Sequence, residues 1–319
     1  MDDRRPALSQ SHRKLNPMPP KHPMIQTVRT ATLEIAYEAH GPSDGTHVIL
    51  LHGFPYDPRA FDAVAAGLAE AGLRVIVPYL RGYGPTRFLS ADTMRSGQQA
   101  ALAQDLLDLM DALGIERAGL AGYDWGGRAA CIVAALSPHR VIGLATGNGY
   151  NIQNIAASAI PQHAEAEYRY WYQYYLHTTR GAAGLASDRR GFCRFLWHLW
   201  SPTWTFDDAC FNASAASFDN ADFVEVVVHS YRHRYAYVAG DPAYDAIERA
   251  LATIPSIAIP TISICGRDDG VAPPPSADRD ATRFTGLYRR IILPGVGHNM
   301  PQEAPNATIE ALLELVRPR

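Results

Sequence analysis

The segment around Asp124 constrains the fold more than any other part of the chain. A short apolar stretch, residues 118–121, runs into Gly122-Tyr123-Asp124-Trp125-Gly126-Gly127 and then into a helical pattern over 127–136. Glycines two residues before and two residues after a central residue are typical of the nucleophile elbow, a strand-to-helix turn too sharp for bulky neighbours. Such strain costs roughly 1–3 kcal/mol and is usually kept at functional sites. Asp124 is therefore a candidate nucleophile, with helix N-capping as the alternative role.

Strand and helix patterns alternate on both sides of this turn. We expect two N-terminal strands within 26–39, as in a hairpin, and an amphipathic helix over 96–113. The further expected strands are residues 47–51, 73–78, 118–121, 141–146, 261–265 and 288–293, and the further expected helices are 58–72, 127–136, 245–251 and 309–316. Strands that alternate with helices of this length form βαβ units, so the fold class is α/β, with a mostly parallel sheet covered by helices on both faces.

Residues 151–244 interrupt this alternation and have a different composition. Nine of the sixteen tyrosines lie between Tyr168 and Tyr244, and four of the five tryptophans lie between Trp171 and Trp204. We interpret this segment as an inserted helical cap that lines an apolar pocket, although most of these rings are expected to pack within the cap itself. The predicted organisation is a flexible N-terminal tail at 1–24, a core at 25–150 and 245–319, and a cap at 151–244.

Composition and charge exclude several classes of protein. The net charge of −3 is unlike that of a nucleic-acid-binding protein, and the sequence holds no run of 18 uncharged apolar residues that could cross a membrane. The first 24 residues lack the apolar region of a signal peptide. The four cysteines form no CxxC pair, so neither a disulfide framework nor a metal site is expected. These features predict a cytoplasmic protein that acts on a small molecule, without nucleic-acid or membrane partners; a homodimer is one option for the oligomeric state.

Two later segments supply partners for Asp124. Gly297-His298 follows the strand at 288–293, and Gly266-Arg267-Asp268-Asp269 follows the strand at 261–265. The order nucleophile, acid, histidine along the chain is that of a hydrolase triad, and the carboxyl ends of strands are where open α/β sheets place their sites. We predict His298 as the triad base and Asp269 as its orienting acid. Asp268 is the second choice, and a purely structural turn is the alternative.

The loop His52-Gly53-Phe54-Pro55 follows the strand at 47–51. In a fold with a nucleophile elbow, this loop supplies one backbone N–H of the oxyanion hole, and the residue after the nucleophile supplies the other. The predicted donors are therefore the amides of Phe54 and Trp125. An ordinary Gly-Pro loop is the alternative interpretation.

An aspartate at the elbow changes the predicted reaction. A carboxylate is already charged, so it needs no base, and it is suited to attack on sp³ carbon with loss of an alkoxide or a halide. The product is an alkyl ester of Asp124, which a water activated by His298 would hydrolyse. Stabilisation of the resulting oxyanion is worth roughly 3 kcal/mol per donor in comparable sites. This chemistry requires no metal and no organic cofactor.

These motifs together resemble the epoxide hydrolase branch of the α/β-hydrolase superfamily. The matching pieces are His52-Gly53-Phe54-Pro55, Arg81-Gly82-Tyr83-Gly84, the run from Gly122 to Gly127, and Gly297-His298 followed by Gln302-Glu303-Ala304-Pro305. The chain departs from the family at Tyr79, where an acid usually precedes the Arg-Gly-Tyr-Gly turn. The resemblance implies an α/β-hydrolase fold with an inserted helical cap over roughly residues 25–317.

The resemblance also implies two cap tyrosines that donate protons to the epoxide oxygen. Ser230-Tyr231-Arg232 resembles the second of the family's cap motifs and assigns Tyr231. Tyr168 heads a Tyr-x-x-x-Tyr-Gln stretch that resembles the first motif, but the aromatic run also permits Tyr170 or Tyr172. The residues assigned to substrate binding are His52, Trp171, Tyr172 and Arg128.

The same set of motifs is compatible with other functions. The first alternative is a haloalkane or haloacid dehalogenase. Haloalkane dehalogenases usually carry Asn after the His-Gly pair, where this chain has Phe54, and fluoroacetate dehalogenases carry Arg one and four residues after the nucleophile, where this chain has Trp125 and Arg128. A small-molecule binding protein on a hydrolase fold and an unforeseen hydrolysis, such as that of a lactone, come after these. An epoxide or an organohalide is thus the expected substrate.

Overall fold

A computed structural model describes residues 24–317, in which nine strands form one sheet. The strand order is β1-β2-β4-β3-β6-β7-β8-β9, and β5 pairs with β2. The strands are β1 (Gln26–Arg29), β2 (Leu33–His40), β3 (His47–Leu51), β4 (Arg74–Pro78), β5 (Arg87–Phe88), β6 (Ala118–Gly122), β7 (Val141–Gly147), β8 (Thr261–Gly266) and β9 (Tyr288–Leu293). The predicted tail at 1–24 lies outside the described residues, apart from Met24.

The pairing of the strands confirms the mostly parallel sheet. From β4 to β9 every neighbouring pair is parallel, whereas β1, β4 and β5 each pair with β2 in the antiparallel direction. The β1–β2 pair is the expected N-terminal hairpin. The central strand β3 reads His-Val-Ile-Leu-Leu and is buried from Val48 onward, as expected for a strand covered on both faces.

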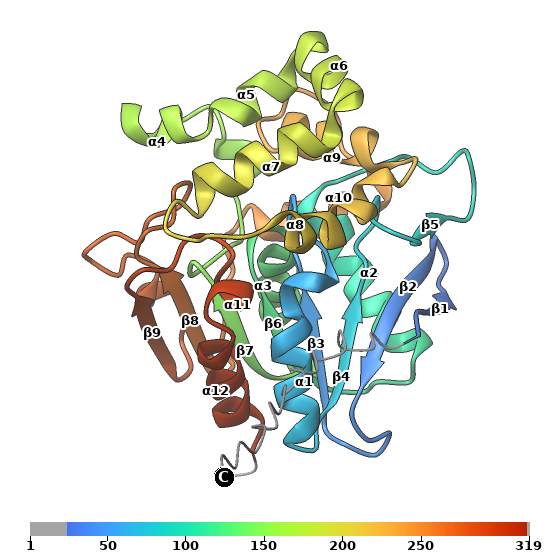
Figure 1. Ribbon diagram of the computed structural model, residues 1–319, viewed down its shortest axis with the longest axis vertical. Helices are drawn as coiled ribbons and strands as arrows, with labels where there is room; N and C mark the ends of the chain where they lie inside the picture. The colour runs from blue at the N-terminus through green and yellow to red at the C-terminus, as the bar shows by residue number, and fades with distance from the viewer. Residues whose placement is uncertain (1–23, 318–319) are drawn as a thin grey trace, which may run out of the picture.

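Helices cover both faces of the sheet (Figure 1). The core helices are α1 (Asp62–Glu70), α2 (Gln99–Ala112), α3 (Asp124–Leu136), α10 (Asp245–Leu251), α11 (Met300–Glu303) and α12 (Pro305–Val316). On one face α1 packs against α12, and on the other α2 packs against α3. The expected helix at 58–72 is divided into a short 3-10 helix, Pro58–Phe61, and α1.

Between β7 and α10 the chain forms a set of helices, called the insertion below, that lies over one end of the sheet (Figure 1). Its α-helices are α4 (Ala164–Arg169), α5 (Trp171–His177), α6 (Thr179–Ser187), α7 (Arg189–Trp200), α8 (Asp208–Ala215) and α9 (Phe223–His233). The indole of Trp197 donates to the Pro55 carbonyl at 2.8 Å, and the Trp200 carbonyl accepts from the amides of Gly270 and His298. Helix α7 therefore contacts the loops that follow β3, β8 and β9.

The turn after β4 accommodates the unusual Tyr79. Its hydroxyl donates to Glu38 at 2.8 Å, and its ring packs against Gly84, whose positive φ of 49° favours glycine. Arg81, the first residue of the Arg-Gly-Tyr-Gly turn, forms a bidentate ion pair with Asp105. Both N–O distances are 2.6 Å, and both residues are buried. The departure at Tyr79 therefore leaves this turn well anchored.

All four cysteines lie in the described part of the chain and are free thiols. Within residues 24–317, no helix has the length and apolar character needed to cross a membrane.

Candidate active site

The strand-to-helix turn at Asp124 has the predicted geometry. Asp124 is the first residue of α3 and has a positive φ of 51°, which is uncommon for a residue with a side chain. A Cβ atom on Gly122 would lie 2.4 Å from the Gly126 carbonyl oxygen, and one on Gly126 would lie 2.1 Å from the Leu51 carbonyl oxygen. The flanking glycines are therefore required by close packing. Tyr123, rather than Asp124, occupies the N-cap position, so the capping interpretation does not hold.

The two carboxylate oxygens of Asp124 have different surroundings. Oδ1 accepts a hydrogen bond from the Phe54 amide at 2.8 Å, whereas Oδ2 lies 3.8 Å from Nε2 of His298. The loop can approach this closely because Gly53 has no side chain; a Cβ there would lie 2.4 Å from the Cβ of Asp124. One oxygen is thus held by a backbone donor, and the other faces the histidine.

His298 is fixed on its opposite side by Asp269. The Nδ1 atom of His298 lies 2.7 Å from Oδ2 of Asp269, and both residues are buried. The other oxygen of Asp269 accepts from the amides of Val271 and Ala272, each at 2.8 Å. Asp268, the second choice in the sequence, instead accepts from the Gly295 amide at 2.8 Å and stabilises the turn.

The charges of this cluster shift the pKa values of Asp124 and His298 in opposite directions. Burial alone would raise the pKa of Asp124, but the nearby charge of His298, the charge of Arg234 and the hydrogen bond from the Phe54 amide together lower it. Burial alone would lower the pKa of His298, but Asp269 and Asp124 raise it to about 10. The imidazole is therefore protonated near neutral pH while Asp124 carries its negative charge.

Two tyrosines of the insertion pack against each other near this cluster. The rings of Tyr172 on α5 and Tyr231 on α9 meet edge to face, with centroids 5.3 Å apart, and both residues are buried. The Tyr231 hydroxyl has no hydrogen-bond partner among residues 24–317, whereas the Tyr172 hydroxyl accepts from Gln173 at 2.9 Å. Burial is the main cause that raises the pKa of both phenols, and the charge of Asp124 raises both further. Both hydroxyls therefore remain protonated at neutral pH.

A cavity of about 940 Å³ opens onto Asp124, His298 and Tyr172, whereas Tyr231 packs behind Tyr172 and is not among its lining residues. Its lining includes Asp124 and His298 from the core and Tyr170, Tyr172 and Arg234 from the insertion. Its volume lies within the range of small-molecule sites.

The comparisons with known proteins agree with this geometry. The family model described as the alpha/beta hydrolase fold matches residues 46–305. The chain belongs to the α/β-hydrolase superfamily. A solved structure of a candidate epoxide hydrolase from Klebsiella pneumoniae is 47% identical, with a TM-score of 0.89, and the match covers 91% of this chain and 96% of that one.

Two further similar proteins have a lower sequence identity to this chain. Epoxide hydrolase A of Mycobacterium tuberculosis is 25% identical over 92% of this chain and 97% of its own length. A candidate epoxide hydrolase structure from Pseudomonas aeruginosa shares the fold, with 21% identity, a TM-score of 0.77 and coverage of 94% and 97%. The similarity to the Klebsiella pneumoniae and Mycobacterium tuberculosis proteins assigns the chain to the epoxide hydrolase branch of the α/β-hydrolases.

The sequence assignment of Tyr168 is corrected by the structure. Tyr168 lies on α4 with 78% of its surface exposed, and its side chain does not line the cavity. The helical structure is interrupted at Tyr170, where α4 ends and α5 begins. As a result Tyr172, four residues after Tyr168, is the ring that faces Tyr231. Trp171 is also not part of the cavity wall, because it packs among Tyr175, Phe192 and Phe195 within the insertion.

The other predicted site residues differ in where they lie relative to the cavity. His52 is fully buried, with Nδ1 bonded to the Gly53 carbonyl at 3.1 Å and Nε2 accepting from the Leu80 amide at 3.1 Å. Burial lowers its pKa to about 4, so it is a neutral residue that shapes the loop, and it is not among the residues that line the cavity. Arg128 does line the cavity. The Trp125 amide stays a prediction as the second oxyanion donor.

Two residues of the hydrolase site were missed by the sequence reasoning. Asn148 donates to Oδ2 of Asp269 at 2.8 Å and has a positive φ of 61°. Its signal was its place between Gly147 and Gly149 at the end of β7, since Asn tolerates the left-handed conformation. Arg234, which follows α9, lies in no motif that would have indicated it.

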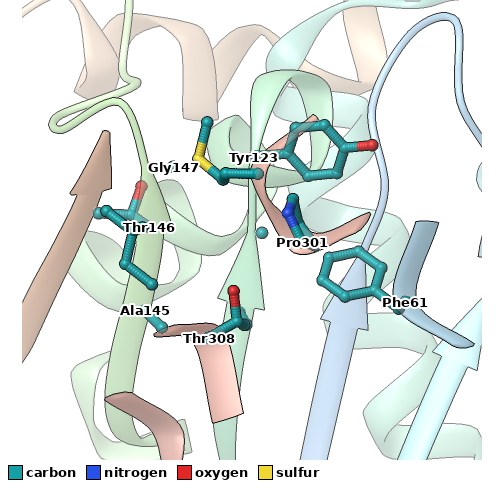
Figure 2. Close-up of a pocket in the computed structure, with 11 residues that line it drawn as sticks. Phe61, Tyr123, Ala145, Thr146, Gly147, Pro301 and Thr308 are labelled. Carbon is teal, nitrogen blue, oxygen red and sulfur yellow. The ribbon is translucent and has the colours of Figure 1, made fainter. Parts of the chain in front are cut away.

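A second, much smaller cavity lies behind the elbow (Figure 2). Its walls include Phe61, Tyr123, Thr146, Pro301 and Thr308. At about 10 Å³ it has room for roughly one water, so it cannot hold a substrate.

Proposed function

We propose that this protein is an epoxide hydrolase that converts an epoxide to a vicinal diol through a covalent ester of Asp124. The observation that carries the proposal is a carboxylate at the elbow, bonded to the Phe54 amide and facing the His298–Asp269 pair. The buried hydroxyl of Tyr231, which has no partner in the part of the chain that the structure describes, favours an epoxide, because the strained ether needs an acid to leave as an alcohol. The named epoxide hydrolases among the relatives support the same reaction.

In the first step, Oδ2 of Asp124 attacks an epoxide carbon and the C–O bond of the ring breaks. We assign the attack to Oδ2 because Oδ1 is held by the Phe54 amide. The electron pair passes to the epoxide oxygen, which takes a proton from Tyr231 or Tyr172. The result is a β-hydroxyalkyl ester of Asp124, with Oδ1 as the ester carbonyl.

Ester formation removes the negative charge of Asp124, which lowers the pKa of His298 and lets the imidazole release its proton to solvent. In the second step, the neutral His298 removes a proton from a water that attacks the Asp124 carbonyl carbon. The negative charge develops on Oδ1, where the Phe54 amide, together with the predicted Trp125 amide, stabilises it. The ester bond to the alkyl group then breaks and the diol leaves with a proton from His298. The second proton of the water is left on the Asp124 carboxyl group and passes to the tyrosinate, which restores the tyrosine and the carboxylate. The net reaction is epoxide plus water to diol.

The same proposal assigns roles to the two parts of the chain. Residues 25–150 and 245–319 would form the catalytic core, and residues 151–244 would form a cap that supplies the acids and closes the cavity. The four free thiols support the cytoplasm as the proposed location.

A dehalogenase is the second candidate, because the buried indole N–H of Trp125 has no hydrogen-bond partner in the described part of the chain and could face a halide. Two converging side-chain donors would be expected for that reaction, and Phe54 supplies none from its side chain. The epoxide hydrolase therefore remains the first proposal.

The test is turnover of styrene oxide, an aliphatic epoxide, a bromoalkane and fluoroacetate by the wild type and by Asp124→Asn. We expect diol from an epoxide with the wild type and none with the variant. Halide release without diol would move the protein to the dehalogenases. Equal diol formation by both proteins would reject Asp124 as the nucleophile.

A further inference from the structure

Two arginines line the same cavity as Asp124. Arg128 comes from the second turn of α3, and Arg234 is the residue that follows α9 in the insertion. Only 8% of the surface of Arg234 is exposed. Its guanidinium carbon lies 4.6 Å from the centre of the Tyr231 ring, so this positive charge is next to a proposed acid.

Neither arginine has a carboxylate within ion-pair distance in the described part of the chain. Arg128 donates only to neutral acceptors, the Asn151 carbonyl at 3.4 Å and the Gln153 side chain at 3.2 Å. By contrast, the buried Arg81 has a bidentate partner in Asp105. Arg234 is buried and Arg128 is partly buried. A charge taken out of water without a partner is costly, and such charges are usually kept where a ligand supplies the partner.

The electrostatics of the two side chains agree with this geometry. Burial and then the charge of Arg234 lower the pKa of Arg128 to about 10, so the two guanidinium groups repel each other. The negative charge of Asp124 acts on both arginines, but its oxygens face the Phe54 amide and His298. Glu248 interacts with Arg128, but its oxygens accept from Gln98, Gln99 and the Ala100 amide.

Two other carboxylates of the cavity wall are bound to different donors. Glu167 accepts from the Tyr174 hydroxyl and from the Gln162 amide. Asp280 accepts from the Tyr150 amide at 3.1 Å. Among residues 24–317, no ion pair therefore offsets the positive charge at Arg128 and Arg234.

We propose that Arg128 and Arg234 bind a carboxylate group of the substrate, so that the preferred substrate is an epoxide that carries a carboxylate. The inference rests on the proposed epoxide hydrolase function and adds the substrate class. Guanidinium groups suit this role because each can donate two parallel hydrogen bonds to one carboxylate. A bound carboxylate would also offset the repulsion between the two arginines.

Arg234 has a second effect that the test must separate from substrate binding. Its charge partly offsets the effect of burial on the phenol pKa of Tyr231 and Tyr172. A change in acid strength would alter the turnover of charged and neutral epoxides alike. Carboxylate binding alters their ratio, so the ratio of kcat/KM values is the informative quantity.

The experiment compares 3-phenylglycidate with 3-phenylglycidamide, in which a neutral amide replaces the carboxylate, and uses styrene oxide as a further neutral epoxide. We expect the wild type to prefer the acid over the amide by about tenfold or more in kcat/KM. Arg128→Gln and Arg234→Gln should each bring that ratio toward one, and Arg234→Lys should restore part of it. Arg190→Gln is the matched control, because Arg190 is an exposed arginine of the insertion paired with Asp219.

Each outcome decides a different claim. Equal turnover of acid and amide by the wild type, or a ratio that neither Gln variant changes, would overturn the carboxylate site while leaving the epoxide hydrolase standing. Absence of diol from all three epoxides would reject the proposed function and this inference with it. The wild-type comparison needs no variant, so the inference stays testable even if a Gln variant fails to fold.

Discussion

Oδ2 of Asp269 lies 2.7 Å from Nδ1 of His298, and that contact orients the whole imidazole. Since a carboxylate can only accept, Nδ1 carries the hydrogen of this bond and Nε2 is directed toward Asp124. Asp269 is itself held by three donors, two backbone amides and Asn148. The histidine thus has one fixed side and one side available for proton transfer.

Replacement of His298 by Gln should separate the two proposed steps. Attack by Asp124 does not require the imidazole, whereas hydrolysis of the ester needs it as the base. We expect His298→Gln to accumulate the alkyl-enzyme ester, with a mass increase equal to that of the epoxide in intact mass spectrometry. The double variant His298→Gln with Asp124→Asn should show no increase. An unmodified single variant, with an epoxide that the wild type accepts, would contradict the covalent mechanism.

The buried tyrosine pair should supply most of the acid catalysis. Removing the Tyr231 hydroxyl leaves the ring packing in place but takes away a proton donor, and a positioned general acid typically contributes about 10²- to 10⁴-fold. We expect Tyr231→Phe to slow ester formation by about 100-fold in single-turnover experiments, and Tyr172→Phe to slow it as well. Tyr168→Phe is the control and should match the wild type, because that ring is 78% exposed. A Tyr231→Phe rate equal to that of the wild type would remove this residue from the acid role.

The core could be predicted from the sequence because each of its elements has a local signal. The apolar run of β3 and the glycines around Asp124 are determined by burial and by close backbone packing. The short strand β5, Arg87–Phe88, was missed because two residues carry no periodic pattern.

The insertion was harder to predict for a physical reason. In the run from Tyr168 to Tyr175 almost every residue is aromatic, so helical periodicity cannot tell inward from outward positions. The break between α4 and α5 at Tyr170 decides which ring is buried, and that break depends on tertiary packing. Arg234 approaches Arg128 only through the fold, so no motif could have linked them.

The charge of Asp124 should control the pKa of His298. Asp269 and Asp124 together raise that pKa to about 10, so removing one negative charge must lower it. We expect NMR titration to give a lower His298 pKa in Asp124→Asn than in the wild type. Ester formation neutralises Asp124 in the same way, so the rate of ester hydrolysis should rise with pH and level off well below pH 10. An unchanged pKa in Asp124→Asn would show that Asp124 does not influence the imidazole.

Asn148 should support ester hydrolysis through its hydrogen bond to Asp269, and stability through its backbone conformation. Asn148→Gly keeps the positive φ available but removes the donor to Asp269, whereas Asn148→Ala also adds backbone strain. We expect Asn148→Gly to slow ester hydrolysis with little loss of stability, and Asn148→Ala to be less stable by about 1–2 kcal/mol in addition. Urea unfolding and single-turnover rates measure the two effects separately. Wild-type hydrolysis rates in Asn148→Gly would limit this residue to a backbone role.

Two aspartates on the same helix should differ sharply in their contribution to stability. Asp105 pairs with the buried Arg81, whereas Asp111 pairs with Arg140 at the surface and is 65% exposed. Asp105→Ala would leave the Arg81 charge buried without a carboxylate, which typically costs about 3–5 kcal/mol. Asp111→Ala should cost less than about 1 kcal/mol, since exposed ion pairs are weak. Urea unfolding of the two variants measures the contrast, and similar losses would mean that solvent reaches Arg81 and compensates its charge.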